Sequence, residues 1–308
     1  MTARCALVFP GQGSQRAGML DAVPELESLG RLLDAAEALS GLELSTIARL
    51  GGPEDLADTR VAQPLLYLAD WAWGFTLLES GVKPVAVAGH SLGEIAALAV
   101  AGVFSAEAGL ELVVERSKLM ASTAAATPGG MSAVLGMDSA AISAAIAGID
   151  GVWVANDNAV AQVVISGTSA GLELASVALL EAGARKIVPL AVSGPFHSPL
   201  MEPARLAFEQ LILGAEFADS SIPVLQNTDP TPETDGERIR ERLIAQITSP
   251  VRWTETMAAL VAEGPITLIE SGPGSVLTGL AKRVDGATGF AVEVSDLETI
   301  VEEVTQDA

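Results

Sequence analysis

Short apolar runs and helical patterns alternate along the first hundred residues. The run 6–9 is followed by a helical pattern over 65–78, a second short run over 85–88 and a helical pattern over 95–101. Short buried strands that alternate with helices are typical of a parallel sheet covered by helices. The pattern therefore predicts an α/β fold with a mainly parallel sheet.

The order of the predicted elements changes in the middle of the chain. It becomes strand, helix, strand, strand, helix, strand over 131–135, 139–147, 152–155, 162–166, 171–181 and 186–192. This βαββαβ order is typical of a ferredoxin-like unit. The small, polar stretch 121–130 is interpreted as a flexible crossover into it. We therefore expect a small subdomain over 126–192, inserted into a large subdomain formed by 1–125 and 193–308.

The last third of the chain predicts elements that can return to the first sheet. They are a helix over 198–213, a strand over 222–226, helices over 238–247 and 254–262, and a strand over 266–269. The segment 228–236 is rich in Pro, Thr and Asp, a composition typical of a surface loop.

Composition limits the partners of the protein. The longest uncharged apolar stretch, Ile95–Phe104, is too short to cross a bilayer, so we expect no membrane span. The 39 acidic and 17 basic residues give a net charge of −22, which argues against binding of nucleic acid or anionic lipid. The basic pairs Arg185–Lys186 and Lys282–Arg283 could still form a local docking patch.

The start of the chain and its single cysteine bear on the compartment. A lone Arg4 and a few apolar residues precede Pro10, so the two regions of a secretory signal are missing. Cys5 excludes an intrachain disulfide and is expected in the core. We expect a cytoplasmic protein, and a monomer, because the sequence has no heptads or long apolar edge.

The segment Gly89–Gly93 has the pattern G-x-S-x-G between a predicted strand and a predicted helix. A sharp strand-to-helix turn needs small flanking residues and lifts the serine oxygen toward a helix N-terminus, which favours developing negative charge. Ser91 is therefore a candidate nucleophile. An ordinary tight turn can carry the same five letters.

A serine nucleophile needs a base, which is usually histidine, and the chain has two. His90 adjoins Ser91, where neighbouring side chains diverge, so we expect it to pack or to orient the turn. His197 is the candidate base by elimination; the alternative is a solvent-facing loop histidine. Either a carboxylate or a backbone carbonyl could orient its imidazole.

The glycine-rich turn 10–15 directly follows the first predicted strand. No Lys-Ser or Lys-Thr follows it and its G-x-G-x-x-G spacing is incomplete, which argues against a phosphate loop. The turn can instead form an oxyanion hole from the N–H groups of Gln12 and Leu92. A plain strand-to-helix turn is the other interpretation.

Arg116 lies in a predicted helix among apolar neighbours. An arginine can pair a substrate carboxylate through two parallel hydrogen bonds in a closed site. Taken alone, Arg116 is also compatible with a solvated position paired with Glu111 or Glu115.

With these residues, the chain resembles the malonyl-CoA:acyl carrier protein transacylases of fatty acid synthesis and the related acyltransferase domains of polyketide synthases. The resemblance covers nearly the whole length. The matching segments are FPGQGSQ (9–15), AQPLL (62–66), GHSLGE (89–94), ERSKLM (115–120), GGMSAVLG (129–136), NDNAVAQVVISG (156–167), FHSPLM (196–201), SPVRW (249–253) and ESGPGSVLTGL (270–280).

The resemblance implies an α/β-hydrolase-like large subdomain with a ferredoxin-like insert and an active site between them. Ser91 would be acylated from malonyl-CoA, and His197 would act as base and then acid. The backbone N–H groups of Gln12 and Leu92 would bind the oxyanion.

The resemblance also implies how the site is completed. The backbone carbonyl of Gln246 would orient His197, and Arg116 would hold the malonyl carboxylate. The remaining substrate-binding residues would be Gln63, His90, Met120, Asn156, Asn158 and Phe196. The expected partners are malonyl-CoA and an acyl carrier protein, and no metal or redox cofactor is expected.

Two positions bear on specificity. Asp157 stands where the family's asparagine-tyrosine-asparagine run has tyrosine, and we expect it to alter the pocket rim or the carrier-protein surface. Phe196 is similar to malonyl-type polyketide domains, whereas methylmalonyl types tend to have serine there, which favours a small unbranched acyl group.

Four functions stay open on the sequence. The leading one is malonyl transfer in fatty acid biosynthesis. The others are a free-standing polyketide acyltransferase for malonyl or another dicarboxylic extender unit, a thioester hydrolase that uses the same serine, and a carrier-binding module without chemistry. The joint presence of Ser91, His197 and Arg116 argues against the last.

Overall fold

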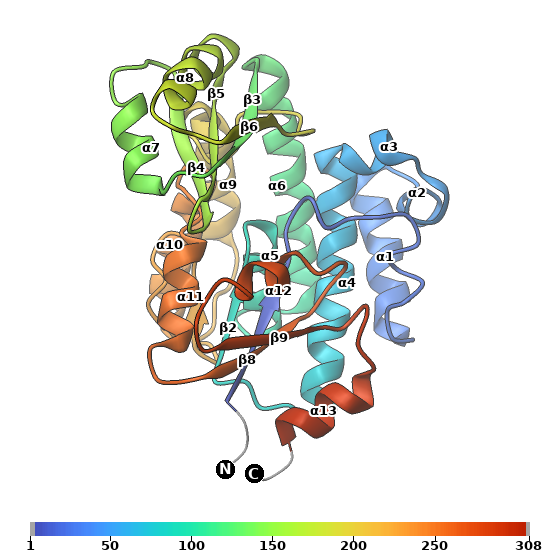
Figure 1. The fold of residues 1–308 in the computed structure, drawn as a ribbon. Coiled ribbons are helices and arrows are strands. Elements are labelled where there is room, and N and C mark those ends of the chain that lie inside the picture. Colours follow the sequence, from blue (N-terminus) through green and yellow to red (C-terminus); the bar gives the residue numbers. More distant parts are fainter. Residues whose placement is uncertain (1–3, 306–308) are drawn as a thin grey trace.

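The computed structural model describes residues 4–305 and contains two sheets (Figure 1). The larger sheet has five strands, and all neighbouring strands in it are parallel. In spatial order they are β7 (Val224–Leu225), β2 (Ala86–Gly89), β1 (Cys5–Phe9), β8 (Ile266–Glu270) and β9 (Ala287–Ala291). The predicted mainly parallel sheet is confirmed.

Helices cover both faces of this sheet, so its central strand β1 is buried on both sides. Its residues Cys5, Leu7 and Phe9 belong to one hydrophobic core, and Ala6 and Val8 belong to another. The first core is completed by α1 (Glu27–Ser40), α2 (Leu44–Leu50), α3 (Pro53–Ala57), α4 (Thr59–Glu79), α5 (Leu92–Val100), α6 (Ala106–Ala126), α9 (Glu202–Gly214), α10 (Gly236–Gln246) and α13 (Leu297–Thr305). The second core is completed by α11 (Trp253–Val261) and α12 (Val276–Ala281).

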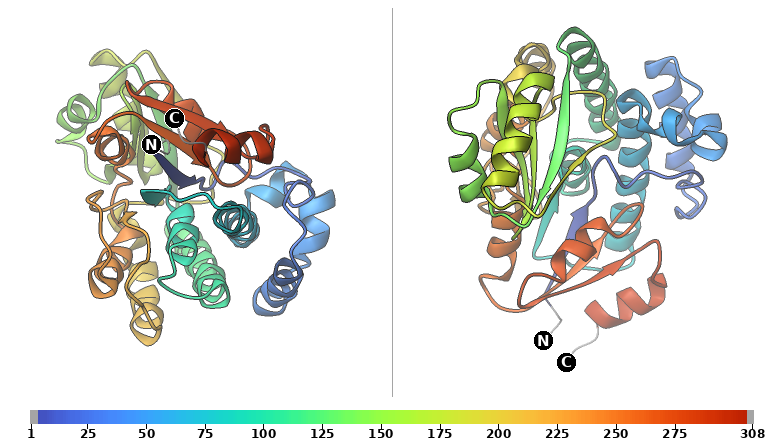
Figure 2. Two further views of the ribbon diagram at one scale, coloured as in Figure 1. Left: turned by 90° about the horizontal axis from the view of Figure 1, so that it is seen from below. Right: turned by 45° about the horizontal axis from the view of Figure 1, so that its top comes forward.

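The smaller sheet is antiparallel and lies at the top of Figure 1. Its spatial order is β4 (Val152–Ala159), β5 (Gln162–Thr168), β3 (Gly129–Leu135) and β6 (Lys186–Pro189). The helices α7 (Ser139–Ile146) and α8 (Ser169–Glu181) share a separate core with it. This βαββαβ unit, drawn in green to yellow in Figure 2, confirms the ferredoxin-like prediction.

Several sequence predictions need correction. The stretch 121–130 is not a flexible crossover, because α6 continues to Ala126 and β3 begins at Gly129. Its alanines keep the helix going, since alanine has the highest helix propensity. The strand predicted over 186–192 ends at Pro189, and the helix predicted from 198 begins as a 3₁₀ turn at Pro199–Met201.

Other features agree with the sequence or extend it. Cys5 is buried, and burial raises the pKa of its thiol to about 11, as expected for a core cysteine. None of the helices within residues 4–305 combines the length and the apolarity that a bilayer crossing requires. The helices α1, α2, α3, α12 and α13 and the strand β9 were not predicted.

The small sheet is joined along β4 to the segment that precedes α11. The N–H of Asp157 donates to the carbonyl of Val251 (2.9 Å), and the N–H of Val251 donates to the carbonyl of Ala155 (2.8 Å). The hydroxyl of Thr254, at the start of α11, donates to Asp157 Oδ1 (2.7 Å). The side chain of Asp157 thus ties the small sheet to α11, and Asp157 is not among the residues that line the central cavity, although its neighbours Asn156 and Asn158 are. That it alters the pocket rim or the carrier-protein surface stays a prediction.

This arrangement supports the proposal of a small subdomain over 126–192 and a large one formed by 1–125 and 193–308. The helix α6 ends and the strand β3 begins within three residues of the first boundary. The second boundary lies in the segment between β6 and Pro199.

Candidate active site

The segment Gly89–Gly93 forms a strand-to-helix elbow between β2 and α5. A Cβ atom on Gly89 would lie 2.0 Å from the carbonyl oxygen of Gly93, and one on Gly93 would lie 2.1 Å from the carbonyl oxygen of Phe9. Only glycine allows this close approach of backbones. Between them, Ser91 has φ 53°, a left-handed conformation that is strained for a residue with a side chain.

Ser91 and His197 are within hydrogen-bond reach of each other. The distance from Ser91 Oγ to His197 Nε2 is 2.7 Å. His197 is 3% exposed and also has a left-handed backbone, with φ 55°. Strained residues of this kind collect at functional sites, where the surrounding structure over-determines them.

Backbone carbonyls orient the imidazole of His197. Its Nδ1 lies 3.1 Å from the carbonyl oxygen of Gln246 and 3.1 Å from that of Ser249. Because carbonyl oxygens only accept hydrogen bonds, Nδ1 must carry the proton, which leaves the Nε2 lone pair facing the serine hydroxyl. Burial first, and then the charge of Arg116, lower the pKa of His197 from 6.5 to about 3.

Arg116 is 1% exposed and extends from α6 to the nucleophile. Its Nη1 donates to Gln63 Oε1 (2.6 Å), and its Nη2 donates to Gln246 Oε1 (2.9 Å) and to Ser91 Oγ (3.2 Å). Burial lowers the pKa of Arg116 to about 10, so the guanidinium is still charged at neutral pH. The alternative of a solvated helix arginine paired with Glu111 or Glu115 is wrong.

The oxyanion candidates lie on the same side of the elbow. Gln12 and Leu92 both line the cavity, and the hydrogen bonds found within residues 4–305 leave their backbone N–H groups without a protein acceptor. A Cβ atom on Gly11 would lie 2.3 Å from the carbonyl oxygen of His90, so glycine lets the turn approach the elbow. The geometry supports the oxyanion interpretation of this turn.

A cavity of about 200 Å³ connects these groups and lies between the two sheets. All the candidate site residues except Gln246 line it, and so do Met131, Gln162, Val164, Leu190, Val192, Val276, Leu277 and Leu280. His90 Nε2 lies 2.8 Å from Asn158 Oδ1, and its ring packs 5.6 Å from that of Trp253. His90 thus packs and orients the turn while it borders the cavity.

Sequence reasoning missed three residues of the site. Asn227 bonds Ser91 N and Gly89 O through its side chain, Glu94 bonds the backbone N–H of Asn227, and Ser249 offers the second carbonyl to His197. Glu94 stands inside the quoted GHSLGE segment, but its partner is 133 positions away. The one available signal was that Asn227 follows the end of a predicted strand, where α/β sheets carry their sites.

The pH dependence of acylation should reflect the lowered pKa of His197. An imidazole with the usual pKa of 6.5 would lose about 30-fold of its basic form between pH 8 and pH 5. With a pKa of about 3, His197 stays neutral over this range, so we expect it to produce no inflection. The measurement is the single-turnover acylation rate at each pH, by rapid quenching and mass spectrometry.

Glu94 also titrates inside this range, because burial raises the pKa of its carboxyl to about 7. The control is therefore Glu94→Gln, which removes this titration and is expected to have a flat profile. An inflection near pH 6.5 in both proteins would contradict the predicted state of His197.

Comparison with known proteins places this site in a family. The model of the acyl transferase domain matches residues 6–297. The chain belongs to the acyl transferase family. A malonyl CoA-acyl carrier protein transacylase from Bacillus subtilis is 40% identical over 302 residues, which cover 96% of this chain and 95% of the relative.

Solved structures agree with this membership. The malonyl CoA-acyl carrier protein transacylase of Coxiella burnetii is 33% identical, with a TM-score of 0.93 and 99% of each chain covered. A malonyl-transacylase solved in complex with its type II polyketide acyl-carrier protein is 36% identical, with a TM-score of 0.89, and 99% of this acyltransferase and 100% of that chain are covered. The two-subdomain fold of the acyltransferase is that of its family.

Proposed function

We propose that this acyltransferase moves a malonyl group from coenzyme A to the phosphopantetheine thiol of an acyl carrier protein in fatty acid biosynthesis, through an ester on Ser91. The observation that carries the proposal is the buried guanidinium of Arg116, 3.2 Å from Ser91 Oγ. The carboxyl carbon of a malonyl group is two bonds from the thioester carbon that the serine attacks. A cation at this place therefore suits an acyl group that ends in a carboxylate.

In the first half-reaction, Ser91 Oγ attacks the thioester carbon while His197 Nε2 takes the hydroxyl proton. The carbonyl oxygen gains negative charge, which the N–H groups of Gln12 and Leu92 stabilise together with the positive end of α5. The carbon–sulfur bond then breaks, and the coenzyme A thiolate takes the proton from His197. The product is malonyl-Ser91.

The second half-reaction runs the same steps with the carrier thiol. His197 accepts the thiol proton, the thiolate attacks the ester carbon, and Ser91 Oγ leaves with the proton that His197 returns. An acyl group passes between sulfur and oxygen without electron transfer, so the proposed chemistry needs no metal or redox cofactor.

Arg116 would exclude neutral acyl groups. An acetyl group offers no partner for the guanidinium, and a buried charge left without its ligand is costly. Gln63 and Gln246 hold Arg116 from two sides, so the guanidinium is aimed before the substrate enters. Phe196 is buried at the cavity wall, which supports a small unbranched acyl chain.

To dock on this acidic chain, a carrier protein would need a local patch of basic residues. Arg185, Lys186, Lys282 and Arg283 take part in none of the ion pairs within the described range 4–305. The second pair directly follows α12, whose Leu277 and Leu280 line the cavity. This position supports the partnership with a carrier protein.

Intact-mass spectrometry after brief mixing with malonyl-, methylmalonyl- and acetyl-CoA tests the proposed function. We expect a malonyl adduct that maps to Ser91 and disappears when a carrier protein with its phosphopantetheine is added. An adduct that decays equally fast without carrier would contradict transfer and support the hydrolase. Intact protein without any adduct, and without release of free coenzyme A, would contradict both enzymes and support the binding module.

The second candidate is a free-standing polyketide acyltransferase, which the similarity to a transacylase solved with a polyketide carrier supports. Discharge onto the two kinds of carrier distinguishes the pathways. Faster discharge onto a fatty acid carrier supports the first candidate, and faster discharge onto a polyketide carrier supports the second.

A further inference from the structure

The strand β7 is shorter than its neighbour β2 and stops one residue before the end of β2. Val224 and Leu225 of β7 stand opposite Val87 and Ala88 of β2, and β2 then continues to Gly89 while β7 stops. Beyond this pairing, the next backbone groups on the β7 side are the carbonyl of Gly89, at the end of β2, and the N–H of Ser91, which follows it in the elbow. Unpaired, these groups would be free at the point where the chain turns into the elbow.

The side chain of Asn227 takes the place of the missing strand. Its Nδ2 donates to the carbonyl of Gly89 (2.6 Å), and its Oδ1 accepts from the N–H of Ser91 (2.7 Å). In a parallel sheet a residue bonds the carbonyl before its partner and the N–H after it. Asn227 does this around His90, with a side-chain amide in the role of a backbone amide.

The opposite edge of the same peptide is held by β1. The N–H of His90 donates to the carbonyl of Phe9 (2.9 Å). The peptide between Gly89 and His90 is therefore fixed on both sides, by the backbone of β1 on one and by the side chain of Asn227 on the other. Asn227 is 1% exposed, so water cannot replace its hydrogen bonds without opening the site.

Glu94 holds Asn227 in this position. Glu94 is the third residue of α5, where a glutamate usually bonds back to the N–H of the capping residue. Here the N–H of the capping residue Ser91 already donates to the side chain of Asn227. Glu94 Oε2 accepts instead from the backbone N–H of Asn227 (2.7 Å). Asn227 is thus inserted into the cap of the helix that starts at the nucleophile.

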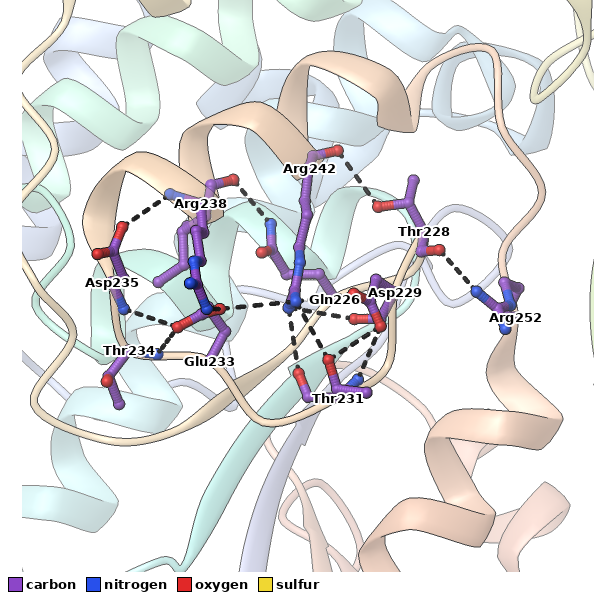
Figure 3. A network of polar contacts seen from close by, with 11 residues as sticks. Gln226, Thr228, Asp229, Thr231, Glu233, Thr234, Asp235, Arg238, Arg242 and Arg252 are labelled. Atoms are coloured by element: carbon purple, nitrogen blue, oxygen red, sulfur yellow. Dashed lines mark hydrogen bonds and ion pairs between the residues drawn. The ribbon is translucent and has the colours of Figure 1, made fainter.

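The loop after Asn227 is also fixed, as Figure 3 shows. Arg252 donates to the carbonyl of Thr228 (2.9 Å). Arg242 pairs with Asp229 (2.7 Å) and donates to the carbonyl of Thr231 (3.1 Å). Because the side chains of α10 and of the segment before α11 hold this loop, the backbone of Asn227 cannot shift freely.

We propose that Asn227 is a positioning residue whose side-chain amide extends the parallel sheet by one rung and thereby sets the conformation of Ser91. This inference rests on the proposed function and deepens it. With the rung in place, Ser91 Oγ faces His197 Nε2, and the N–H of Leu92 points into the cavity for the acyl oxygen. Without it, the left-handed strain of Ser91 can relax, and the nucleophile leaves its line of attack.

The first test is single-turnover acylation of Asn227→Ala by malonyl-CoA. We expect the maximal acylation rate to fall about 100-fold, because a small misplacement of reacting atoms costs a factor of this size. The concentration for half-saturation should stay within about twofold, since Arg116 and the cavity wall are untouched. A maximal rate equal to that of the wild type, or a loss seen only as weaker saturation, would overturn the proposal.

Asn227→Asp gives a signature that a merely structural residue would not give. A carboxylate can accept from the N–H of Ser91 but repels the carbonyl of Gly89, whereas a protonated carboxyl can donate to that carbonyl. We expect the variant to be as slow as Asn227→Ala at pH 8 and to recover at least about tenfold toward pH 5. The charged or titratable groups around this position include Glu94 and Arg252, which bond the backbone of Asn227, His90 beside its amide, and His197 and Arg116, which contact Ser91. The wild type measured at each pH accounts for them.

Two controls separate the possible failures. Thr231→Ala removes the hydroxyl that accepts from Arg242 Nη2 (3.1 Å), keeps the backbone carbonyl that accepts from Nη1, and leaves Asn227 in place, so it should acylate at the wild-type rate. Labelling of Ser91 by a small fluorophosphonate needs neither coenzyme A nor carrier, so it tests the position of the nucleophile even if malonyl transfer is not the function. If Asn227→Ala does not fold, a flat pH profile of folded Asn227→Asp would overturn the proposal.

Discussion

Replacing Ser91 with alanine is expected to abolish acylation by malonyl-CoA, with a loss of at least about 10⁴-fold in rate. The hydroxyl is the only atom of this side chain that can form the ester, and His197 and Arg116 have no other hydroxyl within hydrogen-bond distance among the described residues. The measurement is intact mass after mixing, with the adduct mapped by peptide analysis.

Ser193→Ala is the matched control for this experiment, because it removes a serine hydroxyl at the proposed boundary between the subdomains without touching the elbow. It should acylate like the wild type. An adduct that persists in Ser91→Ala, on any residue, would contradict the assignment of the nucleophile.

Replacing Arg116 with alanine is expected to slow malonyl transfer about 100-fold or more while changing acetyl transfer only a few-fold. Removal of one partner of a buried charge pair costs about 2–5 kcal/mol, and about 2.8 kcal/mol within this range already corresponds to a factor of 100. Because only the malonyl group carries a carboxylate, the loss should fall on that substrate. The ratio of the two kcat/KM values measures it.

Arg116→Lys is the informative companion variant. It keeps the positive charge but loses the planar fork that reaches Gln63 and Gln246 at once, so we expect a malonyl preference between those of the wild type and the alanine variant. Thermal unfolding of all three proteins shows whether the fold is kept. An unchanged malonyl-to-acetyl ratio in folded Arg116→Ala would contradict the role of the guanidinium.

The sequence predicts the layers of this fold better than their borders. Strands buried on both faces, such as β1, carry a continuous apolar run, here between Arg4 and Pro10, which is visible without a structure. The end of α6 was misplaced because Ala121–Ala126 combines small polar letters with good helix formers, and packing decides between the two. The strand β9 is only partly buried and contains a glycine, so its pattern is weak.

The residues of the candidate site also fall into two groups, those that a local pattern or a count reveals and those that only the tertiary fold brings to the site. Ser91 has a local pattern, and His197 could be found by elimination because the chain has only two histidines. Asn227 and Ser249 could not be found in this way, since their roles depend on which strand lies beside β2 and on how the segment before α11 passes the imidazole. Such proximity is created by the tertiary fold and leaves no mark in the spacing of residues.

The bridge between β4 and Val251 limits how this enzyme can be recombined with its relatives. Val251 pairs with the small sheet, and the same short segment supplies the Gln246 and Ser249 carbonyls that hold His197. A chimera that exchanges only 126–192 would seat a foreign strand against the native support of the catalytic imidazole. A chimera with a new acyl-binding small subdomain therefore needs residues 246–254 from the same donor, which requires a second exchanged segment in the gene.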